Sequence, residues 1–132
     1  MSLKIDTKEK FCVIRIEEIQ LIDTMSAELV ALCEHKLTEQ VKNVILDFST
    51  VEEMDSSSIE ALMELQQKFF HEHASFVLCC LKNNIQQRII DISESLEYAI
   101  TPTESEAWDI VQMEEIEREL LDSDDMEFDT NH

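Results

Sequence analysis

The chain contains no glycine among its 132 residues and a single proline, Pro102. About nine glycines would be expected at this length, because glycine makes up roughly 7% of an average protein. Their absence excludes glycine-rich phosphate-binding loops, dinucleotide-binding fingerprints and the G-x-S-x-G turn of serine hydrolases. Turns that need a positive φ angle must use other residue types, and Asn83 and Asn84 are candidates.

Basic residues are also scarce, with 10 lysines and arginines against 30 acidic residues and a formal net charge of −20. Such a surface repels nucleic-acid phosphates and anionic lipid headgroups, so neither is expected as a direct partner. No apolar run approaches the length of a membrane span, and the first residues show no signal-peptide pattern. We therefore expect a cytoplasmic protein without direct membrane insertion.

The four cysteines show no C-x-x-C spacing, and all of them lie in apolar segments. Cys79 and Cys80 are adjacent in a predicted strand, which would point their side chains to opposite faces. His71 and His73 are two residues apart at a helix end, so they do not face each other as metal ligands on a helix would. Buried reduced thiols are the expected state of all four cysteines, and no metal or cofactor is predicted. The remaining two cysteines are Cys12 and Cys33.

Strand and helix patterns alternate along the chain. Strands are predicted at residues 3–6, 11–16, 44–48, 76–81 and 98–101, while residues 19–22 extend the second strand or form a bend. Helices are predicted to begin near Asp23, at the serines at 56–58, near Asn84 and around Pro102.

This alternation, with short connections, predicts one α/β domain over residues 1–121 with a largely parallel sheet. Residues 122–132 are acidic, have little to bury, and are predicted to be disordered.

Each predicted helix carries an apolar stripe that we expect to face the sheet. Trp108 lies beside the last stripe and is interpreted as a core residue. The expected inward residues are Met25, Leu29, Leu32, Cys33 and Leu37, then Ile59, Leu62, Met63, Phe69 and Phe70, then Ile85, Ile89 and Ile92, and finally Ala107, Ile110 and Val111, with Ile116 and Leu120 left open.

Residues 44–65 form the most informative segment, because an apolar strand is soon followed by a helix that begins at three serines. The first backbone N–H groups of a helix lack partners within it and carry the positive end of its dipole. Ser57 and Glu60 match the capping box S-x-x-E. A serine at this place either caps the helix or is exposed for a partner to modify, and the residues alone leave both readings open.

Three local patterns, in this order, resemble the STAS domain, the fold of bacterial anti-sigma factor antagonists. They are Ile22-Asp23 before the first helix, ILDF at 45–48 followed by DSSSI at 55–59, and ITPTESEA at 100–107 before the last helix. The resemblance covers roughly residues 3–120. It implies a STAS-like α/β fold with a mixed, largely parallel sheet of about four or five strands and about four helices.

In that family a partner kinase phosphorylates a serine just after the aspartate, and by position this residue is Ser57. Ser58 stands where the family has glycine, so Ser56, Ser57 and Ser58 are all candidate acceptors. The resemblance implies two partners: an anti-sigma factor that is a serine kinase of the histidine-kinase-like ATPase fold, and a serine phosphatase. The expected partner-binding residues around Ser57 are Asp23, Asp55, Ser56, Ser58, Glu60 and Glu64.

Two other functions compete with this partner-switching module. STAS-like domains also serve as constitutive accessory subunits of membrane transport ATPase complexes, where Ser57 would only contribute to docking. An enzyme with Ser57 as nucleophile is disfavoured, because no histidine falls near the serines to activate the hydroxyl. The lack of glycine also makes a close-approach oxyanion hole harder to build. We therefore predict a non-enzymatic protein with no catalytic residues.

Overall fold

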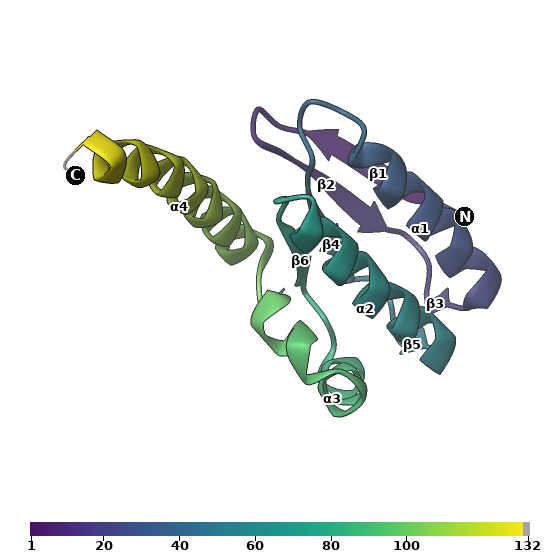
Figure 1. Cartoon of the computed structure of the whole chain (residues 1–132). Coiled ribbons are helices and arrows are strands. Elements are labelled where there is room, and N and C mark those ends of the chain that lie inside the picture. The colour runs from purple at the N-terminus through teal and green to yellow at the C-terminus, as the bar shows by residue number, and fades with distance from the viewer. Residues whose placement is uncertain (131–132) are drawn as a thin grey trace.

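The computed structural model describes the backbone of residues 1–130 and the side chains of residues 1–121. Its main sheet has five strands in the order β1-β2-β4-β6-β7, and Figure 1 labels the first four of them. β1 pairs antiparallel with β2, and the other neighbours are parallel. The bounds are β1 (Leu3–Thr7), β2 (Phe11–Ile16), β4 (Asn43–Asp47), β6 (Phe76–Cys79) and β7 (Ile100–Thr101).

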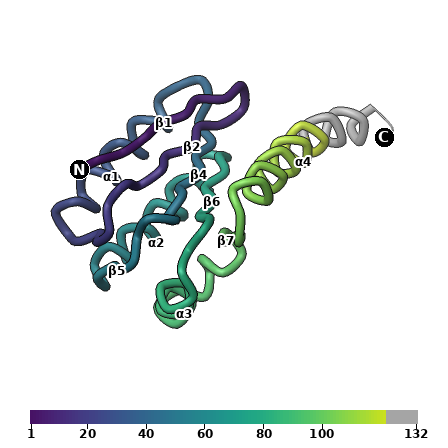
Figure 2. Tube along the Cα trace, turned by 180° about the vertical axis from the view of Figure 1, so that it is seen from behind, coloured from purple at the N-terminus to yellow at the C-terminus, as the bar shows by residue number. Residues whose placement is uncertain are grey.

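Two short strands form a separate parallel pair, β3 (Gln20–Leu21) with β5 (Glu53–Met54). The helices are α1 (Asp23–Lys36), α2 (Ser56–His71), α3 (Asn83–Ile92), the 3-10 helix η1 (Glu94–Ala99) and α4 (Glu104–Thr130). β1 lies at one end of the sheet, and α4 follows β7 at the other (Figure 2). Within residues 1–130, no helix combines the length and apolar character that crossing a membrane requires.

The sheet has a hydrophobic cluster on each face, because successive strand residues point to opposite sides. Ile14, Leu46 and Leu78 pack with residues of α1, α2 and α3 on one face. Val13, Ile45 and Val77 pack with Ala107 and Val111 of α4 on the other. All five residues of β4 are buried, as expected for a central strand covered on both faces.

These elements confirm the predicted α/β fold with its mixed, largely parallel sheet. The edge strand, the β2 and β4 strands and the four helix starts lie close to their predicted positions. Residues 19–22, left open between an extension and a bend, contribute β3 to the second sheet. Nothing tests the disorder predicted for residues 122–132, whose side chains lie outside the described range, so it stays a prediction.

Several residues predicted to face the core are exposed instead. Phe70 is 77% exposed near the end of α2, and Ile92 is 40% exposed at the last residue of α3. Near the end of each helix, the apolar stripe extends beyond the part of the core that the helix covers, so these side chains remain exposed. Ile116 and Leu120, left open above, are also exposed, since the buried apolar contacts of α4 with the sheet come from Ala107 and Val111 near its start.

The start of the chain's last predicted strand also differs from expectation. Tyr98 belongs to η1 and is 86% exposed, so the strand contains only Ile100 and Thr101. Trp108 is half-buried rather than central, with its ring 5.2 Å from that of Phe11. Its indole Nε1 is buried without a hydrogen-bond partner among the described residues.

Positive φ angles occur at His73 (55°) and Cys80 (63°), and the predicted turn residues Asn83 and Asn84 instead open α3. His73 follows the end of α2, where a left-handed residue commonly ends a helix and glycine is the usual choice. A chain without glycine therefore places larger side chains in this region of φ/ψ space.

The buried amide of Asn43 ties α4 to the sheet. Its Nδ2 donates to the backbone oxygen of Lys10 at 2.8 Å and to Oε1 of Glu115 at 2.7 Å. Its Oδ1 accepts from the backbone N–H of Ser75 at 2.8 Å and from Arg118 at 3.3 Å. Four partners satisfy this side chain, which links the starts of β4 and β6 to the middle of α4.

We expect Asn43→Ala to lower the free energy of unfolding by about 1–3 kcal/mol, because it leaves buried donors and acceptors without partners. Urea unfolding followed by circular dichroism measures this change. The matched control is Asn84→Ala, at an exposed position in α3, which should change stability by less than about 0.5 kcal/mol. Equal stability of the two variants would contradict the role given to Asn43.

Candidate functional site

The serine segment lies at the edge of the sheet where the parallel strands end. β4 ends at Asp47, the chain turns through Phe48 and Val51, and β5 then leads directly into α2. Because β5 pairs with β3, the start of α2 is held beside the start of α1. The N-termini of both helices therefore meet at one place on the surface.

The carboxylate of Asp55 caps both of these helices. Its Oδ1 accepts a hydrogen bond from the backbone N–H of Ser58 at 2.9 Å. Its Oδ2 accepts from the backbone N–H of Asp23, the first residue of α1, at 3.0 Å. Hydrogen bonds from Ser58 are the leading reason that the pKa of Asp55 lies below its ordinary value, and the bond from Asp23 adds to the effect.

This geometry corrects the predicted caps. Asp55, not Ser57, is the N-cap of α2, so the expected capping box of Ser57 and Glu60 does not describe this helix start. The helix predicted to begin near Asp23 has Ile22 at its N-cap position, and the hydrogen bond that caps it comes from Asp55. Spacing along the chain could not reveal a cap supplied by a residue 32 positions away.

The three serines have different environments. Ser58 is buried, and its hydroxyl donates to the backbone oxygen of Leu21 at 3.2 Å. Ser56 is exposed and accepts a hydrogen bond from the guanidinium of Arg88 at 3.3 Å. Ser57 is exposed in the first turn of α2, and a hydrogen bond from its side chain helps to lower the pKa of Asp55.

Most of the predicted partner-binding residues share one surface with Ser57. Glu60 and Glu64 are exposed on α2, three and seven residues after Ser57, which places all three on one face of the helix. Asp23 and Ser56 are exposed beside them, and Asp55 is half-buried between the two helix starts. Ser58 supports this surface from below rather than forming part of it.

Arg88 belongs to the same neighbourhood, although no pattern in the sequence points to it. It is exposed on α3, and one guanidinium nitrogen donates to the backbone oxygen of Met54. The other bond reaches Ser56, so one side chain joins α3 to the end of β5 and the start of α2. Only the packing of α3 beside α2 brings these positions together.

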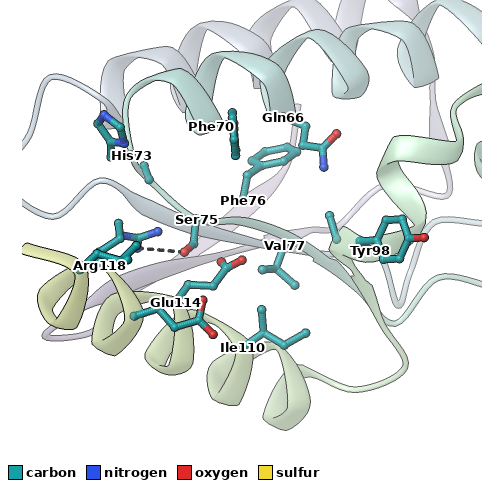
Figure 3. Close-up of a pocket in the computed structure, with 14 residues that line it drawn as sticks. Gln66, Phe70, His73, Ser75, Phe76, Val77, Tyr98, Ile110, Glu114 and Arg118 are labelled. Carbon is teal, nitrogen blue, oxygen red and sulfur yellow. Dashed lines mark hydrogen bonds between the residues drawn. The ribbon is translucent and has the colours of Figure 1, made fainter. Parts of the chain in front are cut away.

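A cavity of about 340 Å³ lies at the other end of α2, between this helix, η1 and α4 (Figure 3). Phe70, Tyr98 and Ile110 line it, and Arg118 donates to the hydroxyl of Ser75 at 3.1 Å inside it. With a helical rise of about 1.5 Å per residue, Phe70 lies roughly 20 Å along α2 from Ser57. No residue of the serine surface lines this cavity.

Solved structures with a similar fold include anti-sigma factor antagonists. RsbS of Moorella thermoacetica, solved with a Ser-to-Glu substitution, has a TM-score of 0.72 at 19% identity and covers 85% of this chain and 96% of its own. SpoIIAA, a cell fate determinant of Bacillus, in its unphosphorylated form has a TM-score of 0.69 at 18% identity, with 84% and 96% covered. The murine anion transporter Slc26a9 has a TM-score of 0.66 at 15% identity, with 79% of this chain but only 18% of the transporter covered.

These likenesses define the fold as that of the anti-sigma factor antagonists. The sequence profile of the STAS domain matches residues 2–107, which is 106 of the 132 residues. The chain therefore belongs to the STAS domain family, which confirms the resemblance drawn from the three sequence patterns. A search of curated protein sequences finds no match.

Asp55→Ala should lower the free energy of unfolding by about 2 kcal/mol at neutral pH, because each lost cap costs about 1 kcal/mol. Asp23→Ala is the matched control, since Asp23 contributes its backbone N–H and not its side chain. Urea unfolding of the two variants measures the difference. A loss in Asp55→Ala no greater than in Asp23→Ala would contradict the double cap.

The contribution of Asp55 should also depend on pH. Its pKa is lower in the folded chain than in the unfolded one, so its stabilisation is present above the unfolded value of about 3.9 and is lost as pH falls through the folded value. The stability difference between wild type and Asp55→Ala should therefore shrink as pH drops below about 4. A difference that stays constant down to the acid unfolding transition would show that the carboxylate charge does not matter.

Proposed function

We propose that this chain is a non-enzymatic regulatory interaction module of the anti-sigma factor antagonist type, switched by phosphorylation of Ser57. The observation that carries this proposal is the placement of Ser57, exposed in the first turn of α2 beside the exposed carboxylates of Glu60 and Glu64. Ser58 is buried and hydrogen-bonded, which argues against it as the acceptor. The position of Ser57 also matches the second serine of the family pattern.

A phosphate at Ser57 is compatible with the fold. It would add a charge of about −1.5 to −2 near neutral pH, at a helix end whose dipole and N–H groups favour anions. Asp55 holds the two helix starts through backbone donors of Ser58 and Asp23, and neither of these bonds uses the Ser57 hydroxyl. Modification would therefore change the charge and bulk of the surface while the helices stay in place.

The proposed partner is an anti-sigma factor that is also a serine kinase of the histidine-kinase-like ATPase fold. It binds the unmodified surface of Asp23, Asp55, Ser56, Glu60 and Glu64, phosphorylates Ser57 and then dissociates. A serine phosphatase restores the unmodified form, and the exchange takes place in the cytoplasm. The likeness to SpoIIAA, which has also been solved in a phosphorylated form at a TM-score of 0.67, supports this cycle.

An accessory role in a membrane transport ATPase complex is the second candidate. The likeness to part of the anion transporter Slc26a9 favours it, since that protein carries this fold within a transport protein. In this role the surface around Ser57 docks without being modified. Neighbouring genes discriminate the two functions: an ATPase-fold kinase with a phosphatase favours the switch, and transporter subunits favour the accessory role.

Catalysis at Ser57 is not part of this proposal, because the described histidines lie far from the serines. His71 ends α2, roughly 20 Å along the helix from Ser57 at about 1.5 Å per residue. His73 follows it, and His35 lies at the far end of α1 from Asp55. Hydrolysis of generic esters that is lost in Ser57→Ala would overturn the non-enzymatic assignment.

Ser57→Asp should abolish binding to the partner kinase while the melting temperature changes by less than about 2 °C, since the position is exposed and favours negative charge. Binding of the co-encoded kinase, measured by isothermal titration calorimetry, tests this. Ser57→Ala is the matched control and should bind like wild type. Undiminished binding by Ser57→Asp would rule out the phosphorylation switch.

The native modification is tested by peptide mass spectrometry of the protein from its own cells, grown with and without stress. The expected result is a partial gain of one phosphate that maps to Ser57. A phosphate on Ser56 would move the site to the hydroxyl held by Arg88. No phosphate under any condition would favour the accessory role.

A further inference from the structure

A second cluster of reactive side chains lies at the carboxyl ends of β4 and β6, and the serine surface does not use it. The sequence pattern placed Cys79 and Cys80 on opposite faces of one strand, and the structure corrects this expectation. β6 ends at Cys79, and Cys80 adopts a positive φ of 63°. This turn takes Cys80 out of the strand alternation and brings its sulfur close to that of Cys79.

Asp47 completes the cluster from the neighbouring strand. It is the last residue of β4 and stands directly opposite Cys79 in the parallel register. The two sulfur atoms and a carboxylate oxygen of Asp47 all lie within 4.8 Å of one another. Among the described side chains, no other group of His, Cys, Asp and Glu brings three ligand atoms so close.

The cluster is buried on the protein side and reachable from outside. Cys79 and Asp47 are buried, whereas Cys80 is half-buried. A hydrogen bond from the backbone N–H of Ser49 at 2.8 Å fixes Oδ1 of Asp47. The remaining carboxylate oxygen and the two sulfurs are the candidate donors, and Cys80 is the most exposed of the three residues.

The charges around the cluster favour a cation. Asp47 lies beside the carboxyl group of Glu104, at the start of α4. The guanidinium of Arg15 makes two hydrogen bonds to Glu104, at 3.1 and 2.7 Å. One guanidinium thus lies near two carboxylates, and a bound cation would balance the negative charge of the second carboxylate.

We propose that Cys79, Cys80 and Asp47 form a zinc-binding site. Two thiolates and one carboxylate are ligands that Zn²⁺ accepts, and three protein ligands leave one tetrahedral position for water or a partner's side chain. Zn–S bonds of about 2.3 Å require sulfurs about 3.8 Å apart, and the present cluster already holds its ligand atoms within 4.8 Å of one another. The ion would join the ends of two central strands beside the start of α4.

Three ligand side chains converge at Cys80, and the positive φ angle of this residue alone would not indicate a metal site. His73 also has a positive φ, in a turn that gathers no ligand group around it. At Cys80 the same conformation coincides with a second thiol and a buried carboxylate from another strand. The conserved spacing of a zinc finger is absent here, because the register of β4 and β6 assembles the ligands.

Cobalt(II) titration of the reduced full-length protein, in the absence of oxygen, tests the site. Thiolate ligands give Co²⁺ an intense charge-transfer absorption in the near ultraviolet, and tetrahedral geometry gives visible bands. We expect both signals to saturate at one Co²⁺ per chain and to disappear when Zn²⁺ is added. Carboxylates on the acidic surface bind Co²⁺ without the charge-transfer band, so this band isolates the cluster.

Cys80→Ala should weaken Co²⁺ binding by at least about tenfold, judged by loss of the charge-transfer band. Asp47→Asn, which keeps the oxygen that accepts from Ser49, should change the visible bands. Cys33→Ala is the matched control, since Cys33 is a buried thiol in α1, outside the cluster, and its spectrum should equal that of wild type. Circular dichroism establishes that each variant is folded. No charge-transfer band in the reduced wild type, or an unchanged band in folded Cys80→Ala, would overturn the proposal.

Discussion

The carboxylate of Asp55 is the constraint on which the serine surface depends. It accepts one hydrogen bond from each of two helix starts, so α1 and α2 are held together at the point where their positive dipole ends meet. The β3–β5 pair and the bond from the Ser58 hydroxyl to Leu21 reinforce this junction. Hydrogen bonds from Ser58, and then the bond from the backbone N–H of Asp23, lower the pKa of this carboxylate.

This junction separates the structural serine from the surface serines. Ser58 is committed to the interior through its backbone and its hydroxyl, whereas Ser57 stays exposed one residue earlier. The proposed modification of Ser57 would therefore change the exposed surface, since the two backbone hydrogen bonds that Asp55 accepts at the junction do not involve the Ser57 hydroxyl. Glycine at position 58 would supply the same N–H to Asp55 but not the hydroxyl that reaches Leu21. Ser58 thus lacks the backbone flexibility of glycine but adds a hydrogen bond to the backbone oxygen of Leu21.

Both proposed sites lie at the carboxyl edge of the parallel strands, where loops gather side chains from neighbouring strands. The turn after β4 leads to the serine surface, and the last residue of β4 contributes Asp47 to the cysteine cluster. α4 covers the face of the sheet opposite to α1 and α2. Asn43, at the other end of β4 from Asp47, holds α4 in place through its hydrogen bond to Glu115. The central strand β4 therefore connects the core, the serine surface and the proposed metal site.

The sequence by itself determined the α/β class, the main strands and helices, the STAS family and the serine segment. These follow from hydrophobic periodicity and local motifs, which depend on residues close together in the chain. Only the tertiary structure decided that Asp55 caps a helix 32 residues upstream, that Arg88 reaches Ser56, and that Cys79 and Cys80 meet Asp47. The exposure of Phe70 and Tyr98 was decided there too. Each of these features depends on which elements pack side by side, and contacts between distant segments leave no periodic signal in the order of the residues.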